Sequence, residues 1–259
     1  MGSLRAKQAS YIEILKAIQL GQLQGLARPD RLLASQIWNT LNKQEYDADL
    51  KLYLPFDEAS GATAHDLSGN GNTGTVIGAT IVDGVFGKAR SFNGVDEIVT
   101  VGAFPVSGAF TYKAWVYPTN ATANHDGIIS NHYIASPCYG VAMSVGLSGT
   151  LEVHAGDGVG NRPPHDWGSA VLPNTVTHVV VVYSGTAFQP YINGKIFGAP
   201  WTATVAQNNT TWCVGRWSPY YDSYWYEGWI DEARVYSRAL SADEIYLHYL
   251  AGALKLGLI

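Results

Sequence analysis

The first 45 residues carry a different hydrophobic pattern from the rest of the chain. Their hydrophobic residues recur every three to four positions, as they do along one face of a helix. Ser10 and Glu13 form a capping box that would begin a first helix, and Pro29 or Asp30 would begin a second. The two apolar stripes are Tyr11, Ile14, Leu15 and Ile18, then Leu33, Ile37 and Leu41. Short amphipathic helices cannot bury such stripes alone, so residues 1–45 are predicted to form a helical attachment arm that packs on the main domain or on another subunit.

From Asp49 onward the hydrophobic period is two. In DLKLYLPF, Leu50, Leu52 and Leu54 alternate with residues of the opposite face, as in a strand with one buried and one solvated side. Stretches of the same kind follow in FTYKAWVYP, DGIISN, YGVAMSV, TLEVHA, THVVVVYSG, FQPYINGKIFG, TTWCVGRW and GWIDEARVYS. Asn193-Gly194 is a strong signal for a two-residue hairpin turn. Many short strands separated by turns predict a sandwich or jelly roll.

One helix is predicted near the end of the chain. Ser241 followed by Glu244 forms a second capping box, and Gly252 is expected to end this helix. The predicted fold is therefore all-β, with an N-terminal helical arm and a short C-terminal helix. We divide the chain into the arm, residues 1–45, and a sandwich domain, residues 46–259.

The composition of the chain argues against nucleic acid as a partner and against a membrane span. Charged residues make up only 14% of the chain, which has 16 Tyr, 8 Trp and a formal net charge of -5. An acidic chain without a Lys/Arg cluster argues against nucleic acid as a partner. The tail LAGALKLGLI is shorter than the roughly 20 residues of a membrane-spanning helix, so no membrane span is expected. No secretory signal peptide is recognisable, and Cys138 and Cys213 allow one disulfide without requiring it.

The loop DLSGNGNTG is rich in oxygen-bearing side chains and glycine. Asp66, Asn70 and Asn72 offer oxygen ligands for half of a calcium site. Asp57 or Asp231 could complete the ligand set if the first and last strands pair. The alternative is a surface turn in which Asp66 accepts backbone hydrogen bonds. The residues leave both interpretations open.

An aromatic stretch, GRWSPYYDSYWYEGW, lies between two predicted strands. Its rings could stack on sugars or anchor a protein interface, because each offers an apolar plane with a polar edge. Six aromatic side chains within ten residues exceed what one strand end can bury. Some are therefore expected to meet a ligand, a neighbouring loop or another chain. The predicted ligand contacts are Trp217, Tyr220, Tyr221, Tyr224 and Trp225.

A second loop, GDGVGNRPPHDWGS, carries a mixed set of polar and aromatic side chains. The members suited to sugar hydroxyls and rings are Asp157, Arg162, His165 and Trp167. The same composition also fits an ordinary solvated loop, so a ligand site and a plain surface loop are both compatible with it.

The motifs of several enzyme classes are missing. There is no Gly-x-Ser-x-Gly elbow, and the seven His show no metal-binding helix spacing, so hydrolase triads and zinc chemistry lack support. Asp231 and Glu232 would lie on opposite faces of a strand and could not flank one glycosidic bond. A glycosidase could still be built from two carboxylates on different strands, and the sequence leaves that possibility open. The chain is therefore predicted not to be an enzyme.

Several stretches occur in an order that resembles a known family. The chain contains LYLPFDEASG, DLSGNGNTG, FGKARSFNGVDEIVTV, FTYKAWVYP, FQPYINGKIFG and GWIDEARVYSRALSADEI. Over about residues 49–252 this order resembles the laminin-G-like, concanavalin A-like jelly-roll family. The resemblance implies a two-sheet antiparallel sandwich, a role in glycan or protein binding and often a structural calcium ion near DLSGNGNTG. Glycanases on this fold carry the pattern Glu-x-Asp-x-x-Glu, which nothing here matches.

The predicted function is non-catalytic binding and assembly. A module that is normally extracellular, in a chain without a recognisable signal peptide, fits the surface of a virion as a capsid decoration, spike or tail protein. Residues 1–45 and the tail ALKLGLI would bind other virion subunits, and the jelly roll would bind a glycan or protein ligand. The alternatives are a carbohydrate-binding module or glycan-active enzyme of this class, and a cell-surface adhesion protein exported by another route.

Overall fold

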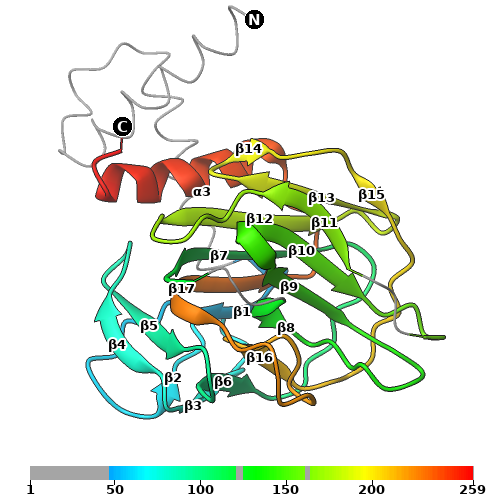
Figure 1. Cartoon of the computed structure of the whole chain (residues 1–259), viewed down its shortest axis with the longest axis horizontal. Helices are drawn as coiled ribbons and strands as arrows, with labels where there is room; N and C mark the ends of the chain where they lie inside the picture. The colour runs from blue at the N-terminus through cyan, green and yellow to red at the C-terminus, as the bar shows by residue number, and fades with distance from the viewer. Residues whose placement is uncertain (1–46, 121–124, 161–163, 259) are drawn as a thin grey trace, which may run out of the picture.

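The computed structural model describes residues 47–120, 125–160 and 164–258. They form two antiparallel β-sheets packed into a sandwich, with the helix α3 (Ala242–Lys255) outside it (Figure 1). The predicted arm, residues 1–45, lies outside the described residues. The sandwich and the C-terminal helix confirm these two parts of the predicted fold.

The larger sheet contains nine strands within the described residues. Its order is β14-β13-β12-β7-β17-β5-β4, with β1 paired on β17 and β15 on β13. Its strands are β1 (Leu50–Leu54), β4 (Thr80–Asp83), β5 (Lys88–Asn93), β7 (Phe110–Pro118), β12 (Thr177–Tyr183), β13 (Ala187–Ile192), β14 (Lys195–Ile196), β15 (Trp201–Thr202) and β17 (Glu227–Tyr236). The first and last strands of the domain pair directly, with Leu50 opposite Tyr236.

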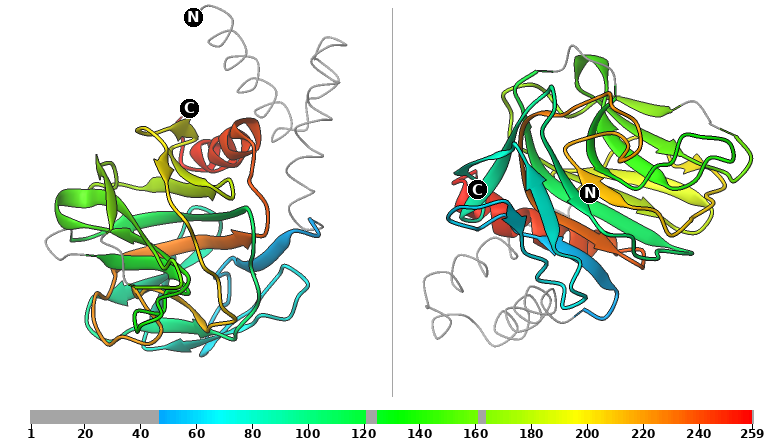
Figure 2. Two further views of the ribbon diagram at one scale, coloured as in Figure 1. Left: turned by 90° about the vertical axis from the view of Figure 1, so that its right-hand side faces the viewer. Right: turned by 90° about the horizontal axis from the view of Figure 1, so that it is seen from below.

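The smaller sheet contains eight strands in the same described part of the chain, in the order β11-β10-β9-β8-β16-β6-β3-β2. They are β2 (Thr63–Ala64), β3 (Gly74–Ile77), β6 (Ile98–Val101), β8 (Asp126–Ser130), β9 (Val141–Val145), β10 (Thr150–Ala155), β11 (His165–Ser169) and β16 (Trp212–Val214). A short 3-10 turn, η3 (Leu147–Gly149), joins β9 to β10. Two orthogonal views show the sheets as separate layers (Figure 2).

The core lies between the sheets, and strand alternation decides which side chains enter it. On β10, Leu151, Val153 and Ala155 point into the core. Because successive side chains of a strand point to opposite faces, Glu152 and His154 project from the outer face of the smaller sheet. Loops cover this outer face, which leaves both side chains buried.

The hairpin between β13 and β14 confirms the turn predicted from Asn193-Gly194. Both residues have positive φ, 49° for Asn193 and 74° for Gly194. A two-residue turn of this kind matches the twist of the strands that it joins, and Asn and Gly tolerate its backbone best.

Helix α3 begins as predicted but continues past the predicted end. Ser241 and Glu244 form the expected capping box. Gly252 does not end the helix, which runs to Lys255. The physical reason is packing, because a Cβ at Gly252 would lie only 2.2 Å from Cζ2 of Trp115. Glycine therefore allows the helix to approach the outer face of the larger sheet closely.

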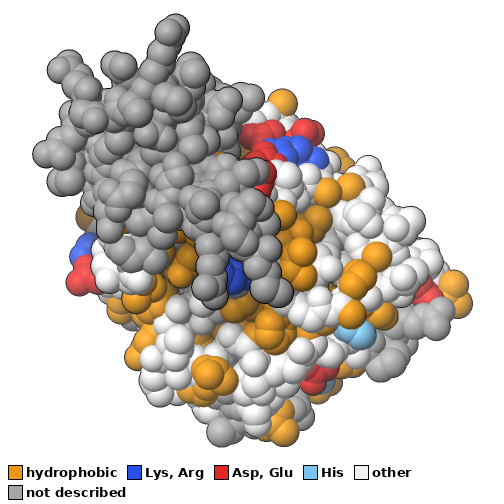
Figure 3. Space-filling view, turned by 90° about the horizontal axis from the view of Figure 1, so that it is seen from above, with side chains coloured by type: hydrophobic (Ala, Val, Ile, Leu, Met, Phe, Trp, Pro, Cys, Tyr) orange, Lys and Arg blue, Asp and Glu red, His pale blue; other side chains and the backbone are white. Residues whose placement is uncertain are grey.

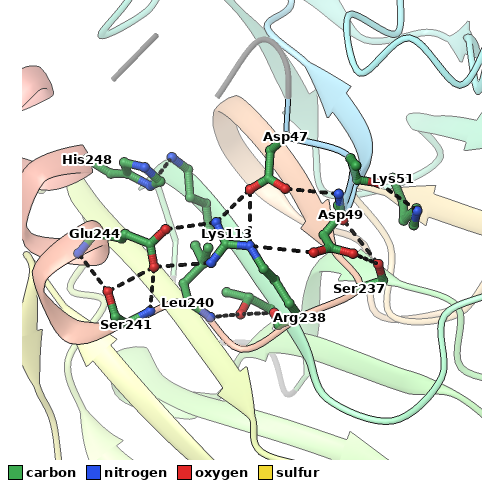
Figure 4. Close-up of polar contacts among 12 residues, drawn as sticks. Asp47, Asp49, Lys51, Lys113, Ser237, Arg238, Leu240, Ser241, Glu244 and His248 are labelled. Atoms are coloured by element: carbon green, nitrogen blue, oxygen red, sulfur yellow. Dashed lines mark hydrogen bonds and ion pairs between the residues drawn. The ribbon is translucent and has the colours of Figure 1, made fainter. Parts of the chain in front are cut away.

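The start of the described chain is fastened to α3 by one arginine (Figure 4). Arg238 Nη2 donates to Asp47 Oδ2 at 2.6 Å and to Glu244 Oε1 at 2.8 Å. The segment that leads out of the predicted arm is thus bound beside the helix. Where the described residues are visible from above, hydrophobic side chains lie among mostly uncharged surface, with a few charged groups (Figure 3). The described residues contain no helix that is both long and apolar enough to span a membrane.

Candidate functional site

A pocket of about 660 Å³ lies where the edge strand β11 of the smaller sheet meets β15 of the larger sheet. Its lining residues are Ala155, Asp157, Val159, Pro164, His165, Trp201, Thr202, Ala203 and Thr204. It combines aromatic rings, hydroxyl groups and a carboxylate. Such a mixture suits a ligand that has both a flat apolar face and hydroxyl groups.

Three rings contact one another at the pocket. The His165 imidazole lies parallel to the Trp201 indole, with ring centroids 4.9 Å apart and planes inclined by 4°. Trp167 packs edge-on against His165 at 4.5 Å, and its Nε1 donates to the carbonyl of Ala199 at 2.7 Å. Gly198 has a positive φ of 68°, and a Cβ there would lie 2.7 Å from Trp167 Cδ1. These contacts hold Trp167 against His165 beside the pocket.

Polar groups complete the pocket. Asp157 Oδ1 accepts hydrogen bonds from the backbone N–H groups of Val159 (2.9 Å) and Gly160 (3.0 Å) and closes a turn there. Burial lowers the pKa of His165, so its ring is neutral at pH 7 and offers one hydrogen-bond donor and one acceptor. Thr202 adds an exposed hydroxyl group.

A second cluster of reactive side chains lies on the outer face of the smaller sheet. His125 immediately precedes β8, and its Nδ1 lies 2.5 Å from Glu152 Oε2. Nε2 of His154 lies 3.3 Å from His125 Nδ1 and 3.7 Å from Glu152 Oε2. His125, Glu152 and His154 thus bring three possible metal-ligand atoms within 4.8 Å of one another. Among the described residues, these are the three His, Cys, Asp or Glu side chains that meet in this way.

The loop between β16 and β17 covers this cluster. The Trp217 ring lies edge-on to His154 at 4.9 Å, and Tyr224 lies edge-on to His125 at 5.0 Å. The backbone N–H groups of Trp217 and Gly127 both donate to the Tyr224 carbonyl, at 3.2 and 3.3 Å. The loop is thereby held on β8 and excludes water from one side of the cluster.

The cluster has an unusual distribution of charge. Burial by itself raises the pKa of Glu152, but the hydrogen bond from His125 and the nearby imidazole of His154 outweigh it and lower this pKa to about 2. Burial lowers the pKa of His154. Burial raises the pKa of Asp126 to about 7, and the carboxylate of Glu227 adds to the effect. At pH 7 the cluster therefore contains the ionised carboxylate of Glu152 beside the neutral imidazole of His154.

The aromatic loop is mostly packed on the protein. Trp217, predicted as a ligand contact, is only 2% exposed and contacts buried histidines instead of solvent. The guanidinium of Arg216 lies over the Trp225 ring, with Cζ 4.6 Å from its centroid. Tyr220 and Tyr221, which are 46% and 44% exposed, are the members that a ligand could reach directly.

The DLSGNGNTG loop has the geometry of the turn interpretation. Asp66 Oδ1 accepts the backbone N–H groups of Tyr53 and Ser68, both at 2.9 Å, and Oδ2 accepts that of Asn72 at 2.8 Å. The side-chain amides of Asn70 and Asn72 each donate to a carbonyl of β1 at 2.7 Å. These side chains therefore fasten the loop along β1.

The two other predicted calcium ligands lie around a different turn, residues 84–87 between β4 and β5. Asp231 Oδ2 accepts the backbone N–H of Val85 at 2.8 Å. Asp57 Oδ1 accepts that of Lys88 at 2.7 Å. The pairing of β1 with β17 thus brings Asp57 and Asp231 to one turn, whereas Asp66 has its own set of partners.

Among the predicted calcium ligands, Asp231 has a carboxylate oxygen that accepts no hydrogen bond from the described residues. Its Oδ1 is buried and has no hydrogen-bond partner among the described residues. Burial raises the pKa of Asp231 to about 8, and the neighbouring Glu232 carboxylate contributes. A buried carboxylate oxygen without a donor fits a cation better than the fully hydrogen-bonded carboxylate of Asp66 does.

A comparison with protein families identifies the family of the chain. The family model described as the concanavalin A-like lectin/glucanases superfamily matches residues 93–246, more than half of the chain. The chain belongs to this superfamily. A comparison with curated protein sequences found no match.

Solved structures similar to this concanavalin A-like chain share its fold at low sequence identity. Domain 4 of AbnA, an extracellular arabinanase from Geobacillus stearothermophilus solved with arabinotriose, is 21% identical with a TM-score of 0.60, over 76% of this chain and 97% of that one. The binding domain of Paraclostridial Mosquitocidal Protein 1 is 18% identical with a TM-score of 0.61, over 80% of this chain and 52% of that one. Trypanosoma rangeli sialidase is 16% identical with a TM-score of 0.62, over 88% of this chain and 40% of that one.

The concanavalin A-like sandwich brings together only some of the predicted site residues. Asp157 lines the pocket and Trp167 packs against the pocket residue His165, while Arg162 lies outside the described residues. The larger contribution of Trp201 was missed, because nothing in the sequence places β15 beside β11.

The sequence prediction also missed the histidine cluster, because its members lie on a strand and in a loop and do not have the histidine spacing of metal-binding helices. The available signal was Glu152 and His154, two positions apart and thus on one face of a predicted strand. Nothing local pointed to His125, which lies 27 residues before Glu152.

Proposed function

We propose that this chain is a non-catalytic glycan-binding module that holds a sugar in the pocket formed by His165, Trp201 and Thr202. The observation that carries the proposal is the pocket itself, in which aromatic rings stand beside hydroxyl groups and a carboxylate. Sugars bind to such surfaces because their C–H faces pack on rings while their hydroxyl groups need hydrogen-bond partners.

The fold neighbours support a glycan as the ligand. One of them is a domain of an arabinanase solved with arabinotriose, and another is a sialidase. Both share the sandwich at low identity, so they support the class of ligand rather than a particular sugar. A protein ligand for the exposed Tyr220 and Tyr221 is the rival proposal.

The proposal of a binding module rather than a hydrolase rests on the carboxylates. Glycoside hydrolysis usually needs two carboxyl groups about 5–10 Å apart on either side of the bond. Among the described lining residues of the pocket, Asp157 is the acidic one, and its Oδ1 already closes a turn.

We also propose that the chain is attached to a virion surface and displays the glycan-binding module there. This proposal rests on the amphipathic pattern of residues 1–45, which needs a partner surface to bury its apolar stripes. The test is the mass in solution of the full chain compared with that of residues 46–259. Oligomers formed by the full chain alone would support attachment through the arm, and identical masses would count against it.

The experiment for glycan binding is a screen of the full chain against immobilised glycans that include arabinan and sialylated oligosaccharides. Binding that is lost in Trp201→Ala and kept in Tyr221→Ala would support the pocket. If glycan binding is lost in Tyr221→Ala alone, the ligand binds to the aromatic loop, residues 215–229, and not to the pocket. Release of sugar from a bound oligosaccharide would contradict the non-catalytic assignment.

A further inference from the structure

His125, Glu152 and His154 lie outside the pocket, and the proposed glycan binding does not use them. We propose that these three side chains form a binding site for one divalent transition-metal ion, with zinc as the best match. This site is separate from the predicted calcium site, and it is independent of the glycan proposal.

The distances between the ligand atoms suit a small tetrahedral ion. Zinc bonds to imidazole nitrogen and carboxylate oxygen at about 2.0–2.2 Å, so two ligands of a tetrahedral ion lie roughly 3.3–3.5 Å apart. His154 Nε2 lies 3.3 Å from His125 Nδ1 and 3.7 Å from Glu152 Oε2. The third separation, 2.5 Å between His125 Nδ1 and Glu152 Oε2, is a hydrogen bond that an ion would replace by moving these two atoms apart.

Hydrogen bonds alone do not satisfy the three atoms. The Glu152 carboxylate can only accept, so the proton between it and His125 belongs to Nδ1 of His125. His154 Nε2 then faces a nitrogen whose single hydrogen is already donated, and it lies too far from Glu152 for a hydrogen bond. Loss of the Nδ1 proton and entry of one cation would give all three atoms a shared partner.

The donor set selects the class of ion. Calcium and magnesium prefer ligand sets made of oxygen, whereas imidazole suits zinc and its neighbours in the first transition row. Two imidazoles and a carboxylate leave a fourth tetrahedral position for water.

The surroundings hold the ligands in place. Oε1 of Glu152, the oxygen that faces away from the histidines, lies 3.5 Å from the Thr150 hydroxyl. A Cβ at Gly146 would lie 2.1 Å from this same oxygen, so glycine leaves the space that the carboxylate occupies. Supporting contacts of this kind fix the orientation of metal ligands.

The site is open on one side. The side chain of His125 is 23% exposed, compared with 8% for Glu152 and 4% for His154. An ion can therefore enter past His125. Once bound, it would tie the segment before β8 to the middle of β10 beneath the Trp217 ring.

The test uses the full chain, stripped of metal with a chelator and then titrated with zinc. We expect one zinc ion per chain, a higher melting temperature with zinc, and tetrahedral visible absorption when cobalt is used instead. His125→Ala and Glu152→Gln should each lower zinc affinity by at least about tenfold, the loss that even a supporting residue can cause. His65→Ala removes an exposed histidine elsewhere and should change nothing.

Folding is controlled by comparing the metal-free melting temperatures and far-ultraviolet circular dichroism spectra of all variants. His125 is the informative position because its side chain is partly exposed and contributes least to the core. Failure of the wild-type chain to bind zinc would overturn the proposal. Equal zinc binding by the wild type, His125→Ala and Glu152→Gln would overturn it as well.

Discussion

His165 and Trp201 lie face to face with their planes inclined by only 4°, although they belong to different sheets. The pocket that they line therefore bridges the two layers of the sandwich at one edge. A ligand bound there would contact β11 and β15 at once, and its affinity would depend on side chains from both.

His165→Phe keeps a flat ring beside Trp201 and removes both ring nitrogens. We expect glycan affinity to fall roughly five- to tenfold, because one hydrogen bond worth about 1 kcal/mol is lost. The melting temperature should change little, since the position is only partly buried. Calorimetric titration measures the affinity, and an unchanged value would show that the imidazole makes no polar contact with the sugar.

Gly252→Ala should destabilise the domain although alanine is the better helix former. The new Cβ would lie 2.2 Å from Cζ2 of Trp115, and overpacking of this kind typically costs about 1–3 kcal/mol. The gain in helix propensity of about 1 kcal/mol offsets only part of it. Urea unfolding gives the change, with the exposed Lys255→Ala as a control that should stay within about 0.5 kcal/mol. A Gly252→Ala protein as stable as the wild type would contradict the close contact.

His178 should make the domain sensitive to acid. Burial, together with the charges of Lys113 and Arg234, holds the pKa of His178 well below its usual value, so the ring is neutral in the folded state. The unfolded chain takes up a proton at this residue below about pH 6.5, and the folded chain does not. This contribution to stability is thus complete above pH 6.5 and is lost as the pH falls, by about 1.4 kcal/mol per unit.

His178→Phe tests this account of the acid response. Both ring nitrogens of His178 are buried without a hydrogen-bond partner among the described residues, and the ring packs against Trp115 and Tyr249. The variant should match or exceed the wild type at pH 7.5. By pH 5 it should lose about 2 kcal/mol less than the wild type does. Equal losses in urea unfolding would show that another group causes the acid sensitivity.

Calcium is expected to act at Asp231 rather than at Asp66. Added calcium should raise the melting temperature of the metal-free wild type and leave that of metal-free Asp231→Asn unchanged, because the buried Asp231 Oδ1 has no hydrogen-bond partner among the described residues. Asp66→Asn should lower the melting temperature with and without calcium, since Asp66 holds its loop on β1. A calcium effect that disappears in Asp66→Asn instead would return the ion to the DLSGNGNTG loop.

The sequence predicted local structure well where one short pattern decides it. Alternation in DLKLYLPF, the Asn193-Gly194 turn and the Ser241 capping box each reappear in the structure. Gly252 was misread because glycine ends many helices, whereas here it permits contact with a tryptophan distant in the sequence.

The sites were harder to predict because they join strands that are far apart in the sequence. Trp201 meets His165 through the packing of two sheets, and His125 meets Glu152 across β8, β9 and β10. Aromatic composition alone pointed to Trp217, whose ring covers the histidine cluster. Residue types indicate the chemistry that a chain can offer, and only the pairing of strands shows which of them meet.

The most direct test of the glycan-binding account is calorimetric titration of one glycan, chosen from the screen, into the wild type, Thr202→Val and Tyr221→Ala. Thr202→Val removes an exposed hydroxyl group from the pocket and keeps the shape of the side chain. The account predicts that affinity falls roughly five- to tenfold for Thr202→Val, because one hydrogen bond is lost, and does not change for Tyr221→Ala. Unchanged binding by Thr202→Val, together with loss of binding in Tyr221→Ala, would contradict it and place the ligand on the aromatic loop.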